Sequence, residues 1–84
     1  MISHLFSVYD SKVEVFMAPW NAVNKGQAIR TFSDLVNDSN HPWSNHIEDY
    51  SLFELGTFDD SCAKFELLKA PERVALAIEL KHES

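Results

Sequence analysis

The chain has 84 residues, a net charge of −6 and a single cysteine, Cys62. This length suits one domain over residues 1–84 and is too short for two, and the 45% hydrophobic content is that of a folding chain. No apolar run approaches the ~20 residues of a membrane span, so we expect no membrane partner. A lone cysteine forms no internal disulfide, which favours a reducing cytoplasm.

The acidic charge is unevenly distributed along the chain. Residues 1–45 carry a net charge of −1 and the remaining residues carry −5. Proteins that bind nucleic acid gain much of their affinity by neutralising phosphates with Lys and Arg. This chain has no such basic footprint, so the fold has to assemble any DNA-binding face from a few scattered cations.

The first 17 residues predict a β-hairpin. Residues 2–9 alternate between two faces, as a strand does, and residues 13–17 alternate again. The turn formers Asp10 and Ser11 lie between the two runs. Pro19 has no N–H to donate and is expected to end the pairing of the second strand.

The period then changes and predicts a helix that begins after Asn24. Apolar residues recur at helical spacing between Ala28 and Val36. Asn24 is the expected N-cap, and Gln27 is placed to return a bond as in a capping box. The polar run 38–40 closes the helix.

A second hairpin is predicted from residue 50 onwards. Residues 50–58 and 64–68 alternate, and a short polar segment joins them. The tail 71–82 has two interpretations, because its apolar residues alternate like a strand whereas its composition and Pro71 favour a helix. We prefer the helix. The predicted order is β-β-α-β-β-α, an α+β domain with an antiparallel sheet of about four strands and one or two packed helices.

Acidic residues gather around this second hairpin, where Glu54, Asp59, Asp60 and Glu66 surround Cys62. Oxygen ligands can hold a hard cation, but the spacing matches no EF-hand loop. Asp and Ser are ordinary turn residues, so we interpret the cluster as the turn of the hairpin. Glu54 and Glu66 each lie six residues from Asp60 and are expected to oppose each other across the strands.

No residue pattern indicates catalysis. His41 and His46 lie near Glu48 and Asp49 but lack the ligand spacing of a zinc site. The acidic neighbours of Cys62 are the opposite of the basic setting that a nucleophilic cysteine needs. With two glycines the chain has no Gly-rich phosphate loop. We therefore predict that the protein is not an enzyme and has no metal or cofactor.

The pattern fits binding better than catalysis. Three cations lie in the nearly neutral half, and two tryptophans lie next to prolines in predicted loops. Aromatic rings with a few cations can stack the bases and hold the phosphates of single-stranded nucleic acid. The alternative is that the tryptophans close a small core. The candidate nucleic-acid contacts are Lys12, Lys25, Arg30, Trp20 and Trp43.

Three segments, FSVYDSKVEVFMAPW, GQAIRTFSDLVNDSNHPW and EDYSLFELGTFDDS, carry a family resemblance. Together they resemble the small nonstructural protein of gokushovirus-type microviruses, single-stranded DNA phages of bacteria, over almost the whole chain. The resemblance implies a protein made in the host bacterial cytoplasm and absent from the virion. It also implies DNA binding, or a switch of replication from duplex DNA to single-stranded genomes for packaging. It brings no catalytic residues; Lys12 and Arg30 lie within its motifs and Lys25 just outside.

Two functions are compatible with these observations. If the fold gathers the cations and loop aromatics on one face, we expect weak, salt-sensitive and sequence-tolerant binding to single-stranded DNA. If it does not, a regulator that acts by protein contact is favoured, docking on the replication initiator, on host replication proteins or on the assembling capsid. A homodimer, expected for so small a chain, would serve either function.

Overall fold

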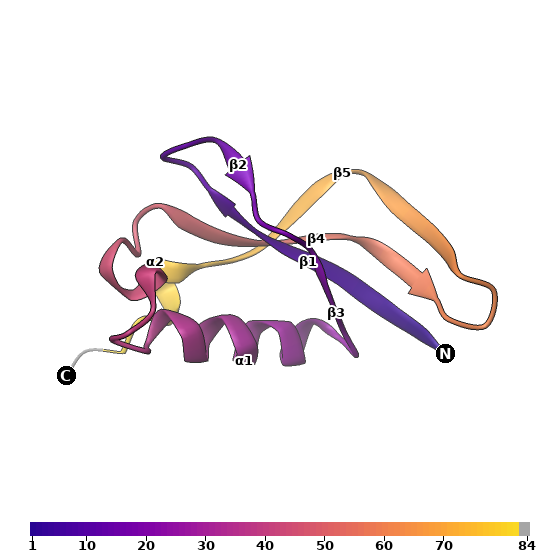
Figure 1. The fold of residues 1–84 in the computed structure, drawn as a ribbon, viewed down its shortest axis with the longest axis horizontal. Coiled ribbons are helices and arrows are strands. Elements are labelled where there is room, and N and C mark those ends of the chain that lie inside the picture. The colour runs from indigo at the N-terminus through magenta and orange to yellow at the C-terminus, as the bar shows by residue number, and fades with distance from the viewer. Residues whose placement is uncertain (83–84) are drawn as a thin grey trace.

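The computed structural model describes residues 1–82 and confirms the α+β class (Figure 1). A curled antiparallel sheet lies over one long helix, and a short 3₁₀ helix and a one-turn helix pack at one end. In chain order the elements are β1 (Ile2–Asp10), β2 (Val15–Phe16), β3 (Trp20–Ala22), α1 (Lys25–Val36), η1 (Pro42–Asn45), β4 (Tyr50–Asp59), β5 (Lys64–Leu76) and α2 (Ala77–Leu80).

The sheet is built around β1. Its strand order is β2-β1-β4-β5. Strand β3 pairs with the same edge of β1 as β2 does, but with residues 4–6 in place of residues 9–10. Every pairing is antiparallel. The four consecutive residues 5–8 are all buried, so the centre of β1 is covered on both faces. The segment after β2 supplies part of that cover, because the Ser7 hydroxyl donates to the Met17 carbonyl at 2.6 Å.

Helix α1 begins where the sequence predicts. The Asn24 side chain accepts a hydrogen bond from the Gln27 N–H at 2.9 Å, and the Gln27 side chain accepts one from the Val23 N–H at 2.7 Å. Each bond satisfies an amide that the first turn leaves without a partner. At the other end, the Asn37 side chain donates to the carbonyls of Ser33 and Leu80, which ties the helix to α2.

The hydrophobic core lies between α1 and the sheet. Helix residues spaced by four contribute one wall and inward-facing residues of β1 and β4 contribute the other. Burial of each large apolar side chain here stabilises the fold by about 1.5–3 kcal/mol. The buried cluster comprises Phe6, Val8, Ala22, Ala28, Phe32, Val36, Leu52 and Ala77.

The predicted C-terminal helix is wrong over most of its length. Strand β5 continues to Leu76, and only Ala77–Leu80 is helical. Pro71 lies in β5, within four residues that have no partner on β4, because Gly56 pairs with Leu67 and Glu54 pairs with Glu72. A proline there interrupts no hydrogen bond between the strands. Pairing of β5 with the long strand β4 therefore outweighs the helix propensity of this segment.

Gly56 lets β5 cross close to β4. A Cβ atom at this position would lie 2.1 Å from the Glu66 carbonyl oxygen and 2.8 Å from the Leu67 Cα atom. Beyond Gly56 the hairpin extends away from α1 (Figure 1), and residues 64–73 of β5 are exposed. We call residues 56–67 the arm, and the part of the sheet that packs on α1 the body.

Candidate nucleic-acid interface

The five predicted contacts do not share one surface. Lys12 lies in the turn between β1 and β2, which projects on the opposite side of the sheet from α1 in Figure 1. Lys25 and Arg30 lie on α1. Trp20 and Trp43 were expected in loops, but Trp20 begins β3 and Trp43 lies in η1. Their proposed contacts with DNA stay predictions, and the fold does not assemble them into a single face.

Lys25 is directed towards a buried carboxylate. Its Nζ atom lies 3.9 Å from Glu54 Oε1, and the His4 Nδ1 atom lies 3.2 Å from the other oxygen. The Glu54 side chain is largely buried beneath the first turn of α1. A buried carboxylate needs such partners because burial removes its hydration. Lys25 therefore has a structural role that competes with holding a phosphate.

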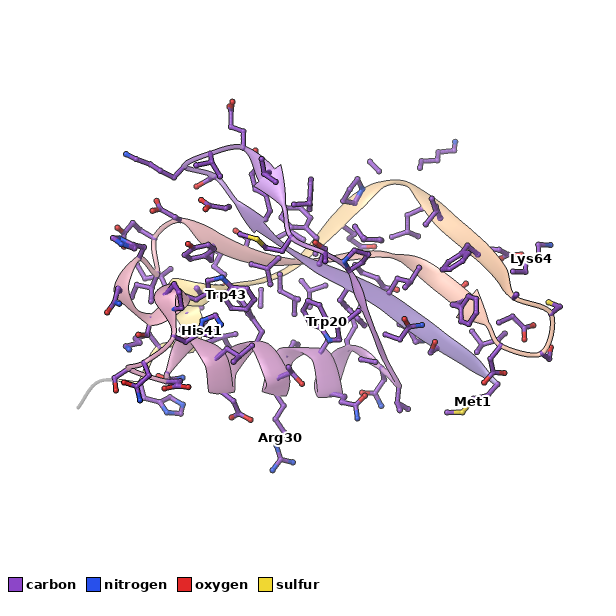
Figure 2. The ribbon with its side chains drawn as sticks, in the orientation of Figure 1. Met1, Trp20, Arg30, His41, Trp43 and Lys64 are labelled. Carbon is purple, nitrogen blue, oxygen red and sulfur yellow. The ribbon has the colours of Figure 1, made fainter. Side chains whose placement is uncertain are left out.

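Arg30 is exposed on the solvent side of α1 and points away from the sheet (Figure 2). None of the ion pairs among residues 1–82 includes it. Asp34 follows one turn later on the same exposed side, so the local potential is close to neutral. Arg30 is accessible to a phosphate but has no exposed aromatic ring beside it on α1.

Both tryptophans pack against the core between α1 and the sheet (Figure 2). The ring centroid of Trp20 is 6.3 Å from that of Phe6, and that of Trp43 is 5.7 Å from Phe32 and 5.8 Å from Tyr50. Burial raises the pKa of the Tyr50 hydroxyl, and the nearby Asp10 carboxylate raises it further. These half-buried rings close the core, the alternative that the sequence left open.

A different aromatic cluster lies on the other face of the sheet. Strand alternation places Phe6 and Val8 towards α1 and Tyr9 on the opposite side. There the Tyr9 ring is 4.7 Å from Phe16 and 6.0 Å from Phe53, and Phe16 and Phe53 are 5.4 Å apart. Phe16 is 41% exposed. We call Tyr9, Phe16 and Phe53 the aromatic cluster.

Two cations border the aromatic cluster. Arg73 of β5 pairs in register with Phe53 of β4, so its side chain leaves the same face of the sheet. Lys12 lies in the turn that joins Tyr9's strand to Phe16's strand. Glu14 shares that turn, and Asp10 is buried and accepts a bond from the Lys12 N–H. Most other acids lie on α1, on the loop before β4 and on the arm.

Two rings of the aromatic cluster can be recognised in the sequence from their positions in predicted strands, not in predicted loops. Tyr9 and Phe53 occupy the polar phase of alternating strands, together with Ser7 and Ser51. An aromatic ring on the polar phase of a strand predicts an aromatic residue on the outer face of a sheet. Only the register shows that Tyr9, Phe16 and Phe53 meet.

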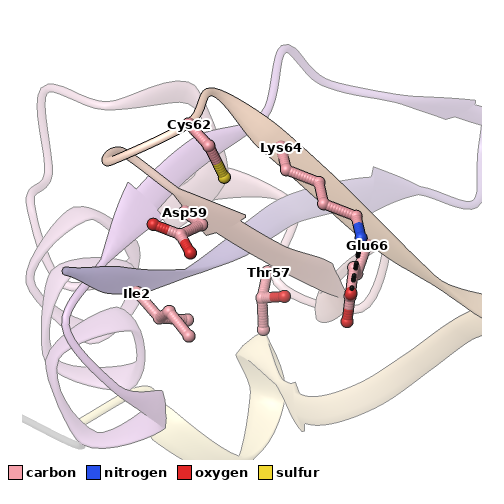
Figure 3. Close-up of a pocket in the computed structure, with 6 residues that line it drawn as sticks. All are labelled: Ile2, Thr57, Asp59, Cys62, Lys64 and Glu66. Atoms are coloured by element: carbon pink, nitrogen blue, oxygen red, sulfur yellow. Dashed lines mark ion pairs between the residues drawn. The ribbon is translucent and has the colours of Figure 1, made fainter.

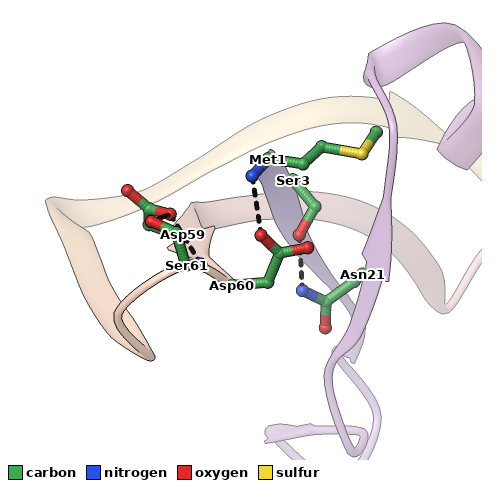
Figure 4. Close-up of polar contacts among 6 residues, drawn as sticks. All are labelled: Met1, Ser3, Asn21, Asp59, Asp60 and Ser61. Carbon is green, nitrogen blue, oxygen red and sulfur yellow. Dashed lines mark hydrogen bonds and ion pairs between the residues drawn. The ribbon is translucent and has the colours of Figure 1, made fainter.

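The acidic cluster of the second hairpin is a turn, as predicted. The Asp59 carboxylate accepts bonds from the Ser61 hydroxyl at 2.6 Å and the Ser61 N–H at 3.0 Å, which lower the pKa of Asp59 (Figure 4). Asp60 pairs with the N-terminal ammonium of Met1 at 2.6 Å, and this contact raises the pKa of that amine.

The predicted opposition of Glu54 and Glu66 is wrong. Glu54 pairs in register with Glu72, and Glu66 pairs with Thr57, because four residues of β5 have no partner on β4. Cys62 is exposed and borders a shallow pocket of about 310 Å³ beside Lys64 and Glu66 (Figure 3). The charged side chains that line this pocket are Asp59, Lys64 and Glu66.

One group of side chains has the composition of a metal site. His46, Glu48 and Asp49 place one potential ligand atom each within 4.8 Å of one another in the loop before β4. The bond from the Asp49 N–H to the His46 carbonyl, 2.9 Å long, brings the two residues together. His46 and Glu48 are exposed, and exposed groups of this kind are common in turns without an ion.

The fold defines a small α+β protein with a partly exposed aromatic cluster on one face of its sheet. Over residues 3–80 the chain matches the family model described as phage ORF5 protein, and it belongs to this family. The match confirms that the resemblance to a phage protein is correct; the narrower assignment to gokushovirus-type microviruses stays a prediction. No curated protein and no solved structure matches the chain significantly. Among the described residues, no helix is long and apolar enough to cross a membrane.

Proposed function

We propose that this phage protein is not an enzyme and acts in replication or packaging of the viral genome by binding single-stranded DNA. The observation that carries the proposal is the aromatic cluster on the sheet face opposite α1, bordered by Arg73 and Lys12. Aromatic side chains on an open sheet face are a recurrent platform for unpaired bases. Membership of a phage family supports the setting.

The charge of the protein sets the expected strength of binding. Each stacked base contributes about 1–3 kcal/mol, and the two bordering cations can neutralise about two phosphates. For single strands the slope of log K against log salt is then about −1.4. A net charge of −6 opposes the approach of DNA, so binding is weak and is lost at moderate salt.

The test is a titration of a fluorescently labelled thymidine oligonucleotide at low and moderate salt. We expect Phe16→Ala to weaken binding roughly tenfold, because one stacking contact is lost. Val15→Ala is the matched control, since Val15 is the exposed neighbour of Phe16 on β2 and its side chain leaves the other face. Equal affinity of wild type and Phe16→Ala, or no binding at low salt, would contradict the proposal.

A pair of charge reversals separates the aromatic cluster from the helix surface. Arg73→Glu removes the cation that borders Phe53, whereas Arg30→Glu makes the same charge change on α1. We expect Arg73→Glu to abolish measurable binding and Arg30→Glu to have a small effect. The reverse result would favour a DNA interface on the surface of α1, where the sequence predicted Lys25 and Arg30 as contacts.

A second candidate function is docking on a basic protein partner, such as the replication initiator, a host replication protein or the assembling capsid. The exposed acids of α1 and the following loops, Asp34, Asp38 and Glu48, favour it. Affinity capture from infected cells with wild type and an Asp34→Lys, Asp38→Lys variant tests it. Recovery of the same phage or host proteins by both variants would exclude this surface.

The proposed location is the cytoplasm of the host bacterium, outside the virion. A protein that acts on replicating or unpackaged DNA is needed before capsids are complete. Mass spectrometry of purified virions and of the infected-cell extract tests this location. Stoichiometric amounts of the chain in virions would contradict it.

A further inference from the structure

Strand register divides the side chains of the sheet between two faces, and the carboxylates of the strands all lie on one of them. Residues paired across neighbouring strands share a face, and successive residues of a strand alternate between faces. One set of register rows is in phase with Phe6, whose side chain is buried in the core with α1. Every carboxylate within the strands belongs to this set, namely Asp10, Glu54, Asp59, Glu66 and Glu72.

We call the other set of rows, which lies on the side of the sheet away from α1 (Figure 1), the acid-free face. Within these rows, which lie wholly among the described residues, Arg73 is the only charged side chain. In a chain of net charge −6, a whole face without a carboxylate is a surface that a polyanion can approach. From the body to the arm the rows are Phe16–Tyr9–Ser51–Leu76, Ser7–Phe53–Arg73, Asn21–Leu5–Gly56–Leu67 and Ser3–Phe58–Phe65.

The acid-free face carries aromatic rings at both ends. The aromatic cluster lies at the end near the β1–β2 turn, and Arg73 is paired with its Phe53. At the arm end, the ring centroids of Phe58 and Phe65 are 4.6 Å apart, and Phe65 is 58% exposed. Stacking of a base on an aromatic ring is tolerant of sequence, so a second exposed pair of rings is a second platform of the same kind.

The accessible part of the acid-free face follows β4 and β5. In the middle of β1, Leu5 and Ser7 are buried and offer no surface to a ligand. The side chains beside them on β4 and β5 are exposed or half-buried, and they connect the two platforms. In order from the body to the arm they are Phe53, Arg73, Leu67, Phe65 and Phe58.

We propose that a DNA strand bound at the aromatic cluster continues along the acid-free face and stacks a further base on the Phe58–Phe65 pair. This inference rests on the proposed function and extends its site. Ser3 and Tyr9 mark the two end rows and are six residues apart on β1, which is about 20 Å along a strand. A stacked strand advances about 3.4 Å per nucleotide and an unstacked one more, so about six unpaired nucleotides reach both platforms.

The charge of the face favours DNA over a second copy of the chain. A copy that covered this face with its own would bring Arg73 no carboxylate, because the same rows lack one in both copies. A buried guanidinium without an acidic partner is costly. A nucleic acid supplies a phosphate at every nucleotide, so it can pair with Arg73 and stack on the rings at either end.

The first experiment compares two labelled strands of equal length at low salt, one of thymidines throughout and one abasic beyond its first few nucleotides. We expect Phe65→Ala to weaken binding of the thymidine strand roughly tenfold and to leave the largely abasic strand unchanged, since that strand has bases for one platform only. Ile2→Ala is the matched control, because Ile2 is 58% exposed beside the arm but belongs to the rows that bear the acids. Circular dichroism establishes that the variants remain folded.

Failure of the inference and failure of the proposed function give different results. If Phe16→Ala weakens binding of both strands and Phe65→Ala weakens neither, the aromatic cluster binds DNA alone and the inference is overturned. If wild type binds neither strand at low salt, the proposed function and the inference fail together.

The second experiment places a fluorescent ring on the arm with Phe65→Trp. Trp20 and Trp43 pack against the core, so wild type supplies the background emission. A base that stacks on the added indole should quench its emission when the thymidine strand is bound. The same substitution at Ile2, on the acidic rows, should show no such quenching. Unchanged emission of Phe65→Trp at a strand concentration that saturates the labelled titration would overturn the inference.

The third experiment separates DNA from a second copy as the occupant of the face. Leu67 is 71% exposed, and Leu67→Glu puts a carboxylate on the acid-free face, so we expect it to weaken binding of the thymidine strand at least tenfold. Ile78→Glu makes the same change in charge on α2 and should bind as wild type does. Light scattering after size exclusion gives the molar mass of each sample. A dimer that Leu67→Glu dissociates without changing the affinity for the strand would overturn the inference in favour of a second copy.

Discussion

Strand β4 passes through two regions with opposite surroundings. In the body, Leu52 is fully buried and Glu54 is largely buried beneath α1. In the arm, a register shift between Glu54 and Gly56 moves the even-numbered residues of β4 to the face opposite α1, and Phe65 and Leu67 beside them are exposed. The difference arises because α1 begins at Lys25 and does not extend beneath the arm. It shows that alternation alone does not decide which apolar side chains form a core.

The two regions should respond very differently to the loss of a phenyl ring. Phe32→Ala in the body should lower the free energy of unfolding by about 3–5 kcal/mol, because it leaves a cavity between α1 and the sheet. Phe65→Ala in the arm should change it by about 0.5 kcal/mol at a concentration that keeps the chain monomeric. Urea unfolding followed by circular dichroism measures both. Equal losses would mean that the arm is part of the core.

Gly56 lies where the body joins the arm. A methyl group at this position should let the arm unfold separately from the body. Gly56→Ala forces the Glu66 carbonyl away from β4 and should cost about 2 kcal/mol or more. We expect hydrogen exchange of the arm amides to accelerate while the amides of α1 stay protected. A matched control is Gly26→Ala, where the nearest atom, Asn24 Oδ1, lies 3.3 Å away and belongs to a side chain. Uniform acceleration in both regions would show that the arm does not unfold separately.

The smallest expected effect concerns the pH dependence of the arm tip. Asp60 raises the pKa of the Met1 amine, so this contact stabilises the tip at neutral pH and is lost as pH rises through that raised pKa. The pKa of Asp59 is lowered by its bonds to Ser61, so its contribution is present above the ordinary value of 3.8 and is lost on acidification through the lowered pKa.

Both groups are exposed, so solvent and salt weaken these contributions. NMR chemical shifts of residues 58–65, followed between pH 3 and 10, measure them. Asp60→Asn should return the pKa of the amine towards its ordinary value of 8.0 without moving the acidic transition of Asp59. A body amide that followed the same titration would show that the tip and the body are coupled.

Local patterns predicted most of the elements. The apolar spacing and the cap at Asn24 predicted α1, and alternation predicted β1, β4 and the turn at Asp59. The tail could not be assigned, because Pro71 and good helix formers favoured one structure and alternation the other. Pairing with β4 decided for the strand, and the unpaired run of residues 68–71 in β5 made room for the proline.

The candidate site was less predictable than the fold. Lys12 was identified and borders the aromatic cluster, but Tyr9, Phe16, Phe53 and Arg73 were not. They come from four separate strands, so their proximity depends on register. The sequence predicted Trp20 and Trp43 as loop aromatics, whereas both side chains pack against the core.

The sequence by itself determined a small acidic chain with an α+β order, a capped helix and a polar turn at the second hairpin, because these features depend on neighbours within a few residues. Tertiary structure alone decided which aromatics are buried, that Lys25 meets Glu54, and that the arm extends uncovered beyond α1. Those outcomes depend on strand register and on the finite length of one helix, which no local pattern contains.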